Sequence, residues 1–562
     1  MKAHLKIAGL CLAFFSLISG AEPKDRTGFD WYTPSLIAIQ DRGRVKPLDT
    51  FARESVQFIT GKASWKKQPP VETIFGWLIA FDGEWEEEPF IRIAYQPVKE
   101  ALKLDKERQH FSPKELRGNE DLQKAVREAL QKQKKAETLS EIDNKVLEIQ
   151  NQRGLLDAIV SGQAWNILPN PAGEHAAWFS LASLTDQSAG EALPAAGLEA
   201  LRGQIGSAIG AFTEVSGQKW NPAVSALRRT LSQDLFPGHY PAERVLLQER
   251  VYNHLRPFRI AWELYLLAVI GLTIFLVSGK HAWQLGGLGV FIAAFLVHTG
   301  GFILRMLVAG RPPVTNMYES VIWVSWGCAL FALIIGTSYK KAVIPAAASV
   351  FAVVALVLAD TLPSVLDPSI QPLEPVLRSN FWLTIHVLTI TLGYAAFALS
   401  LCLGNVVIGH YFFHPKETET IQYASLYMYR AIQIGVVLLA AGTILGGVWA
   451  DYSWGRFWGW DPKEVWALIA LLLYLAVLHG RFAGWLHGFG FAATAVVSFL
   501  GVLMAWYGVN FVLGAGLHSY GFGTGGTGYV GGYVAIQLLF ILWAYRRYSS
   551  SGAKRAAIFP KR

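Results

Sequence analysis

The chain has 562 residues, of which 52% are hydrophobic and only 16% are charged. This balance excludes a fully soluble protein and indicates a polytopic membrane protein with one sizeable polar region. The three cysteines form no Cys-x-x-Cys pair, which excludes a thiol–disulfide oxidoreductase and a cysteine-ligated zinc site. We expect the net charge of +8 to lie mostly at the cytoplasmic membrane edge, so no nucleic-acid partner is implied.

An export signal opens the chain. Residues 1–21 combine a basic start, an apolar stretch and small residues before position 22. This is the pattern of a signal peptide that is either cleaved or retained as an anchor. We therefore expect residues 22–257 to form an extracytoplasmic domain with its own core. A polar helical stretch, Val245 to Arg256, would lead into the membrane.

The extracytoplasmic domain is predicted to be mixed but rich in helix. Residues 71–95 alternate apolar and acidic residues, which is typical of a strand. Residues 99–152 repeat apolar residues at helical spacing, and Ser112 begins a Ser-Pro-Lys-Glu capping box. Ser140 and Asp143 mark a second helix start, which predicts a helical hairpin with a solvated charged face.

Nine apolar segments of spanning length predict an all-α polytopic membrane fold for residues 258–548, before a basic cytoplasmic tail at 549–562. Alternate connections carry lysine or arginine, as the positive-inside rule requires. From an outside start, we expect residues 449–468 and 514–528 to lie on the extracytoplasmic face of the membrane. The segments are 260–278, 284–306, 320–338, 342–359, 381–412, 430–449, 464–480, 487–512 and 529–545.

The segment Trp449–Leu468 crowds seven aromatic residues around an Asp-Pro-Lys-Glu cluster. Aromatic faces at this density can stack on a large planar ligand. The alternative is an aromatic belt at the membrane interface, where tryptophan and tyrosine also collect. A belt spreads its aromatics over many helix ends, so one glycine-punctuated loop favours the ligand platform. The residues are Trp449, Tyr452, Trp454, Phe457, Trp458, Trp460 and Trp466.

Two histidines bracket this loop on the same membrane face. His386 lies near the outer end of its helix, and His518 lies in the last outer loop. Two opposed imidazoles are what a six-coordinate haem iron needs, although a lone membrane histidine is more often structural and zinc is a competing ion. His479 lies near the cytoplasmic leaflet, where it could hold a second haem or the same haem in transit. His298 lies at another depth, so we expect no axial pair between it and His479.

Four motifs in order resemble the CcsA (ResC) branch of the haem-handling superfamily, the cytochrome c synthase type. They are RPPVTNMYES (Arg311–Ser320), FWLTIHV around His386, the tryptophan-rich stretch Trp454–Leu468 and GLHSYGFG (Gly516–Gly523). The resemblance covers about residues 284–545. It implies haem b as the cofactor, with His386 and His518 as iron ligands and His479 as the ligand of haem in transit.

The same resemblance implies which residues surround the haem. Arg456 and Lys463 would pair with the propionates, since charge-assisted contacts are strong. Alternatively, Lys463 pairs with Asp461 or Glu464 and only shapes the loop. The implied haem-binding set is Trp449, Trp454, Arg456, Trp458, Trp460, Asp461, Lys463 and Trp466.

The N-terminal half departs from fused synthases, which carry a CcsB/ResB-like part with several membrane helices. Only Gly43–Ser55 is weakly similar to such fusions. This half is therefore either a reduced CcsB-like part, or a separate CcsB/ResB-like membrane protein completes the synthase. His4 or a histidine of that partner would then face His479. The other implied partners are apocytochrome c and thiol-reducing proteins that keep its cysteines reduced.

The resemblance implies a function in cytochrome c maturation, as a holocytochrome c synthase (haem lyase) or its CcsA-like subunit. Haem would be received or transported, presented at the outer site and attached to the Cys-x-x-Cys-His segment of apocytochrome c. Such catalysis is mostly positioning, and we predict no general acid or base. The alternatives are a haem exporter or chaperone without ligation activity, and a haem-bearing membrane electron-transfer subunit.

Overall fold

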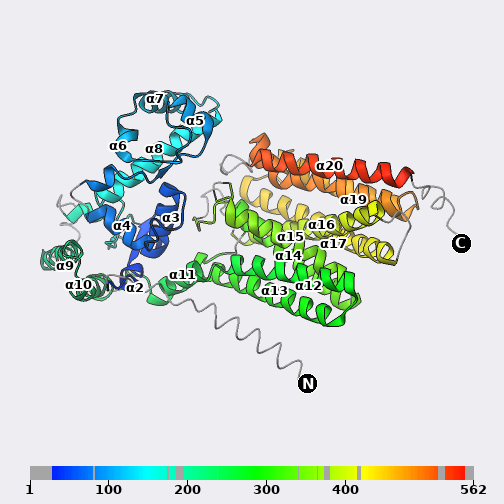
Figure 1. Ribbon diagram of the computed structural model, residues 1–562, viewed down its shortest axis with the longest axis horizontal. Coiled ribbons are helices and arrows are strands. Elements are labelled where there is room, and N and C mark those ends of the chain that lie inside the picture. Colours follow the sequence, from blue (N-terminus) through cyan, green and yellow to red (C-terminus); the bar gives the residue numbers. More distant parts are fainter. Residues whose placement is uncertain are drawn as a thin grey trace, which may run out of the picture. The chain divides into compact units, whose positions relative to one another are not determined.

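The computed structural model is 75% helical, which confirms the predicted all-α polytopic fold class. It divides into two compact units, an N-terminal unit ending at His254 and a membrane unit beginning at Leu255 (Figure 1). The structure describes residues 28–79, 83–173, 176–184, 195–236, 238–312, 314–339, 341–363, 365–372, 380–413, 419–514, 516 and 526–550. The predicted signal at residues 1–21, His4, His518 and most of the basic tail lie outside these residues.

The N-terminal unit packs short helices and two small antiparallel sheets around one aromatic-rich core. Trp220 is fully buried at its centre, with ring centroids 5.0 Å from Trp31 and 5.3 Å from both Phe29 and Phe75. The elements are α2 (Tyr32–Ser35), β1 (Ala38–Asp41), β2 (Arg44–Pro47), α3 (Leu48–Thr60), α4 (Pro70–Ile79), η1 (Glu84–Glu86), β3 (Ile91–Arg92), α5 (Gln96–Ala101), β4 (His110–Phe111), α6 (Pro113–Arg117), α7 (Glu120–Lys134), α8 (Glu141–Val160), η2 (Leu181–Leu184), α9 (Ala195–Thr213), α10 (Gly217–Arg229), η3 (Thr230–Asp234) and α11 (Glu243–Leu255).

The predicted capping boxes are confirmed, and the predicted strand is largely wrong. Ser112 and Ser140 each accept a hydrogen bond from the backbone three residues on, with the reciprocal bond present in both cases. Residues 70–79 instead form α4, because Val71, Ile74 and Phe75 repeat at helical spacing and all three are buried. Among the described residues of 71–95, only the two residues of β3 form a strand.

The segment Gly43–Ser55 supplies β2 and most of α3, and its charged residues bind α11. Arg44 donates two hydrogen bonds of 2.7 Å to the carboxylate of Glu249, which is 2% exposed. Thr50 donates to the same carboxylate at 2.8 Å. A bidentate guanidinium–carboxylate pair fixes orientation as well as distance, so this segment holds α11 in place.

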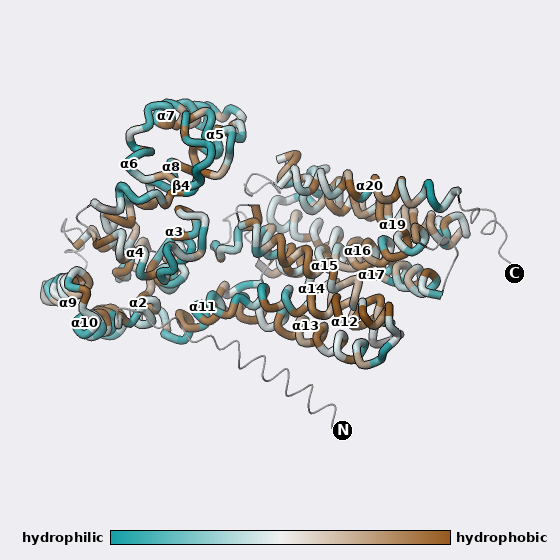
Figure 2. The backbone as a smooth tube through the Cα atoms, viewed as in Figure 1, coloured by the Kyte–Doolittle hydropathy of each residue, from teal (hydrophilic) through white to brown (hydrophobic). Residues whose placement is uncertain are grey.

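The membrane unit contains nine helices, among the described residues, that are long and apolar enough to cross a membrane. They confirm all nine predicted segments. Figure 2 shows that most of their residues are hydrophobic, whereas α7 is mostly hydrophilic. The elements are α12 (Pro257–Ser278), α13 (His281–Ala309), α14 (Met317–Tyr339), α15 (Val343–Thr361), α16 (Asn380–Phe413), α17 (Glu419–Trp454), α18 (Pro462–Phe482), α19 (Gly488–Leu503), the π-helical η4 (Met504–Leu513) that continues α19, and α20 (Thr527–Ser550).

Glycines bring α16 and α17 unusually close together. A Cβ atom at Gly442 of α17 would lie 2.7 Å from the Cα atom of Ile390, and one at Gly393 of α16 would lie 3.0 Å from the backbone nitrogen of Leu439. Contacts this short leave no room for a methyl group. The main chains of α16 and α17 therefore touch directly at this level.

Candidate functional site

A cavity of about 170 Å³ lies inside the membrane unit, lined by α14, α16, α17, α18 and η4 together with the loops before α14 and α18. It brings together four of the predicted haem-site residues, His386, Trp449, Trp458 and Lys463, and adds Phe457 from the same aromatic loop. We call it the tryptophan cavity. Its lining is mainly apolar with a few polar groups, which is typical of a site for a small organic ligand.

His386 is fixed in one tautomer by α17. Its Nδ1 atom lies 2.7 Å from the carbonyl oxygen of Gly442. Since a carbonyl only accepts, Nδ1 must carry the hydrogen, and Nε2 is then the nitrogen with a lone pair for a metal. Gly446 permits this placement, because a Cβ atom there would lie 2.6 Å from Cε1 of the imidazole. The ring also stacks parallel to Trp449, at 6.3 Å and 6°.

The tryptophans divide between the cavity and the outer surface. Trp449 is 1% exposed, and the edge of Trp454 packs on it with ring centroids 4.7 Å apart. Trp458 lines the cavity and contacts Trp460, which is 70% exposed. Trp466 is half-buried on α18 and does not line the cavity. The aromatic loop thus provides an inner wall and also an exposed rim like an interfacial belt.

Asp461 and Glu464 build the loop that begins α18. The Asp461 carboxylate caps the helix by accepting from the backbone nitrogen of Lys463 at 3.0 Å. Glu464 reaches back to the backbone nitrogens of Gly459 and Asp461, at 2.8 and 3.1 Å. Its other oxygen is 3.5 Å from Nη1 of Arg456. The structure therefore gives Asp461 and Arg456 roles in loop architecture, although both belong to the predicted haem-binding set.

Lys463 points into the tryptophan cavity. Its ammonium group donates to Oδ1 of Asn510 at 3.4 Å. No carboxylate of the described residues forms an ion pair with it within 4.0 Å, although the Asp461 carboxylate is near enough to act on it electrostatically. A cation in an apolar cavity that is hydrogen-bonded to a neutral amide favours an anionic ligand group.

His479 lies sixteen residues beyond Lys463 on α18, about 24 Å along the helix axis. Its side chain is exposed, and Nδ1 lies 2.7 Å from the carbonyl oxygen of Leu475. By the same reasoning, Nδ1 carries the hydrogen, and Nε2 carries the lone pair that can bind a metal. His298, in contrast, is fully buried and stacks on Phe302 at 5.3 Å. His479 thus belongs to a separate location from the tryptophan cavity.

Several cavity residues were not predicted as site residues. From the chain segment that begins α14 come Thr315, Asn316, Met317 and Ser320, and η4 adds Trp506 and Asn510. The first group lies in the RPPVTNMYES motif, which supports the family resemblance, but no binding role was predicted for its residues. The second group had a usable signal, since a tryptophan and an asparagine four residues apart are unusual in an apolar span.

The comparisons with known proteins show which family the chain resembles. A family model described as "Cytochrome C assembly protein" matches residues 314–518. The CcsA cytochrome c biogenesis protein of Synechococcus sp. strain RCC307 is 35% identical over 264 residues, covering 41% of this chain and 83% of that protein. The corresponding protein of Prochlorococcus marinus strain MIT 9303 is 35% identical over 291 residues, covering 46% and 90%.

A longer relative also covers the N-terminal unit. Protein NrfI of Wolinella succinogenes is 29% identical over 499 residues, which is 86% of this chain and 54% of NrfI. The chain thus spans about half the length of that relative. A solved structure of the cytochrome c heme lyase CcmF has a TM-score of 0.38 and 15% identity, covering 57% of this chain and 53% of that one. On the CcsA matches, the chain is a multi-pass membrane protein that belongs to the CcsA-type cytochrome c biogenesis family.

Proposed function

We propose that the membrane unit presents haem b in the tryptophan cavity, at the extracytoplasmic face of a bacterial inner membrane, and supports its thioether attachment to apocytochrome c. One observation carries this proposal. The Gly442 carbonyl holds His386 in the tautomer whose Nε2 atom carries the lone pair, and this imidazole lines a cavity walled by tryptophan. We treat haem as the cargo and substrate of this site.

The residues of the cavity fit such a cargo. Trp449 and Trp458 offer flat apolar faces for a macrocycle, and the Lys463 ammonium would pair with a propionate carboxylate. An imidazole suits iron as an axial ligand. The second axial ligand in this proposal is His518, which stands on the motif resemblance because it lies outside the described residues.

His479 supports a role in haem transfer at the other end of α18. Its imidazole is exposed, and its Nδ1 donates to a backbone carbonyl, as that of His386 does. We propose that it receives haem on the cytoplasmic side. A CcsB/ResB-like membrane protein would supply the facing ligand, since an exposed imidazole on a spanning helix is open to a partner.

The reactive groups would come from the haem and from apocytochrome c. Each cysteine thiol of the Cys-x-x-Cys-His segment adds across a haem vinyl group, with sulfur bonding one carbon and hydrogen going to the other. This chain would bind and orient the haem and exclude water with its aromatic walls. Separate reducing proteins would keep the cysteine thiols of apocytochrome c reduced. Catalysis is then positioning, and the chain acts as a haem lyase or as its CcsA-like subunit.

The absorption spectrum of the purified chain tests the haem site. We expect a low-spin spectrum in the reduced wild type. His386→Ala and His518→Ala should each lose it and regain it with added imidazole, whereas His479→Ala should keep the outer-site spectrum. Haem-free wild type, or haem unaffected by either outer substitution, would refute the site.

A second experiment separates ligation from export. The chain would be expressed with a CcsB/ResB-like partner and an apocytochrome c in cells that lack other maturation factors. Thioether-linked cytochrome supports a synthase. Haem that reaches the periplasm without covalent product supports a haem exporter instead.

A further inference from the structure

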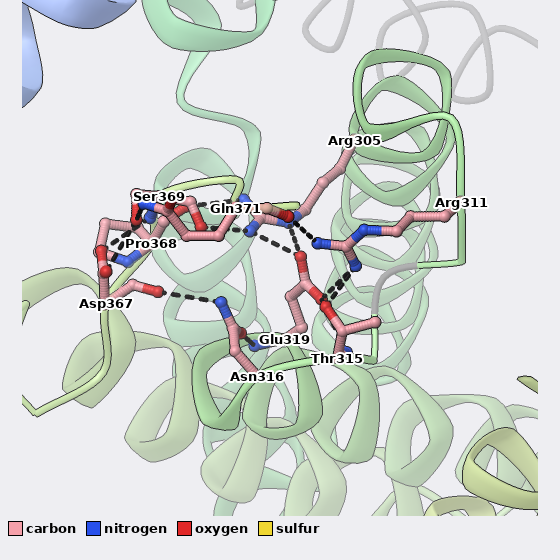
Figure 3. A network of polar contacts seen from close by, with 9 residues as sticks. All are labelled: Arg305, Arg311, Thr315, Asn316, Glu319, Asp367, Pro368, Ser369 and Gln371. Atoms are coloured by element: carbon pink, nitrogen blue, oxygen red, sulfur yellow. Dashed lines mark hydrogen bonds and ion pairs between the residues drawn. The ribbon is translucent and has the colours of Figure 1, made fainter. Parts of the chain in front are cut away.

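A buried network of ion pairs lies beside the tryptophan cavity and has no part in the proposed function so far. Arg305 of α13 and Glu319 of α14 both have fully buried side chains, with Nη2 and Oε1 2.8 Å apart. Arg311, in the connection between these helices, approaches the other oxygen of Glu319 at 3.5 Å. Figure 3 shows the two guanidinium groups converging on this carboxylate. We call these three residues, with their partners Thr315 and Asn316, the arginine–glutamate network.

The network also holds a loop that is distant in sequence. Arg305 donates from Nη1 to the carbonyl oxygen of Pro368 at 2.9 Å, and Arg311 donates from Nη2 to that of Gln371 at 2.5 Å. Within this loop, the Asp367 carboxylate accepts from the backbone nitrogen of Ser369 at 2.9 Å. Three separate stretches of chain are therefore fixed to one another around one carboxylate (Figure 3).

The network and the cavity share residues. Thr315 and Asn316 both line the cavity. The backbone nitrogen and the hydroxyl of Thr315 each donate to Oε2 of Glu319 at 2.8 Å. Asn316 accepts from the backbone nitrogen of Glu319 at 2.8 Å and so caps α14. Any shift of the Glu319 carboxylate would therefore move the cavity wall directly.

Further hydrogen bonds along the cavity wall link the residue after Glu319 to the Lys463 ammonium group. Ser320, the residue after Glu319, accepts from Nε1 of Trp506 at 2.8 Å. One turn further along η4, Asn510 accepts from the Lys463 ammonium at 3.4 Å. Since Ser320, Trp506, Asn510 and Lys463 all line the cavity, the network sits at one end of a bonded chain that crosses it.

A contribution to folding stability does not by itself explain such a network. The free-energy cost of removing two charges from water offsets most of the attraction between them, and apolar replacements of buried ion pairs are often neutral or stabilising. Directional hydrogen bonds, in contrast, fix the register of the parts that they join. The Arg305–Glu319 pair combines such bonds with full burial.

We propose that Arg305, Arg311 and Glu319 are positioning residues for the tryptophan cavity. They fix the wall formed by residues 314–320 at the distance from the His386 wall that bound haem requires. They act through Thr315, Asn316 and Ser320 and do not touch the cargo themselves. This inference rests on the proposed function of the same cavity.

The test replaces all three charged residues by apolar side chains, in the triple variant Arg305→Met/Arg311→Met/Glu319→Leu, so that no buried guanidinium is left without its carboxylate. The control is Arg44→Met/Glu249→Leu, which removes an arginine–glutamate pair with a buried glutamate in the N-terminal unit. We expect the network variant to unfold within about 3 °C of the wild type. Its haem per polypeptide should fall by about tenfold and its reduced spectrum should change, because misplaced walls weaken binding strongly. The control should keep both.

A milder variant covers the case in which the triple variant does not accumulate. Arg311→Lys keeps a cation beside Glu319 but loses the planar fork that also reaches the carbonyl oxygen of Gln371, and it should lose haem several-fold at an unchanged unfolding temperature. Wild-type haem content and spectrum in either folded variant would overturn the positioning role. Haem loss that only follows a lowered unfolding temperature would also overturn it. Haem-free wild type would refute the proposed function itself, which separates the two failures.

Discussion

Replacing Gly446 by alanine should displace His386 and strongly weaken haem binding. The new Cβ atom would lie 2.6 Å from Cε1 of the imidazole, whereas ordinary contacts begin near 3.4 Å. The ring must therefore move by about 0.8 Å. A shift of that size along the bond stretches the 2.7 Å contact with Gly442 to about 3.5 Å, beyond the normal range for N–H···O.

The magnitude follows from the role of that bond. Losing the partner that orients a metal-binding histidine typically reduces affinity by about 10- to 100-fold. Gly490→Ala is the matched control, because it lies on α19 with nothing within 4 Å of the added Cβ atom. Both substitutions gain similar helix propensity, about 1 kcal/mol. The difference between them therefore isolates the contact with His386.

The assay is haem per polypeptide after purification, together with the reduced absorption spectrum and the unfolding temperature. Gly446→Ala should lose haem while Gly490→Ala retains it. In a His386→Ala background the added methyl group meets no ring, so Gly446→Ala should have little further effect. Equal haem in the two glycine variants would refute the reasoning, and so would a full further loss in the His386→Ala background.

Three further predictions concern other parts of the chain. Glu464→Ala removes the acceptor for two backbone nitrogens at the start of α18, so thermal unfolding should show a loss of about 1 kcal/mol; an unchanged unfolding temperature would contradict this. Lys463→Met removes the cavity cation and should speed haem dissociation by about tenfold in stopped-flow transfer to apomyoglobin, whereas Lys463→Arg should not; equal rates in all three proteins would count against a propionate contact. Hydrogen bonds from Lys132 and Ser140 hold the pKa of Asp143 below its ordinary value of 3.8. This carboxylate therefore stabilises the fold above that pH, and the contribution is lost as the pH falls through the lower folded-state pKa. Acid titration of unfolding should show a shallower loss of stability for Asp143→Asn, and parallel curves would refute the linkage.

Local signals account for most of what the sequence predicted. The nine spans follow from apolar length alone, and the caps at Ser112 and Ser140 follow from side chains that bond within one turn. The strand predicted at 71–95 failed because tertiary burial on several sides of α4 hid its helical spacing. Long-range partners such as Glu249 for Arg44 carry no local signal, so they could not be predicted.

The cavity was predicted in part, and one local signal was overlooked. His386, Trp449, Trp458 and Lys463 meet as the aromatic loop and the flanking helix suggested. The Asp-Pro-Lys-Glu run at Asp461 has the same form as the Ser-Pro-Lys-Glu box at Ser112, and the structure shows it capping α18 in the same way. The π-helical form of η4 could not be foreseen, because π-helical turns have no simple sequence pattern.

The tight glycine contact between α16 and α17 makes the two sides of the cavity unequal. On the His386 side the spacing is set by main chain against main chain at Gly442 and Gly393, so substitution there has almost no tolerance. On the opposite side, Met317, Ser320 and Trp506 line the cavity, and each has a side chain that can be exchanged for a larger or smaller one. A redesign that aims to admit a different tetrapyrrole should therefore vary the second side and leave the first untouched.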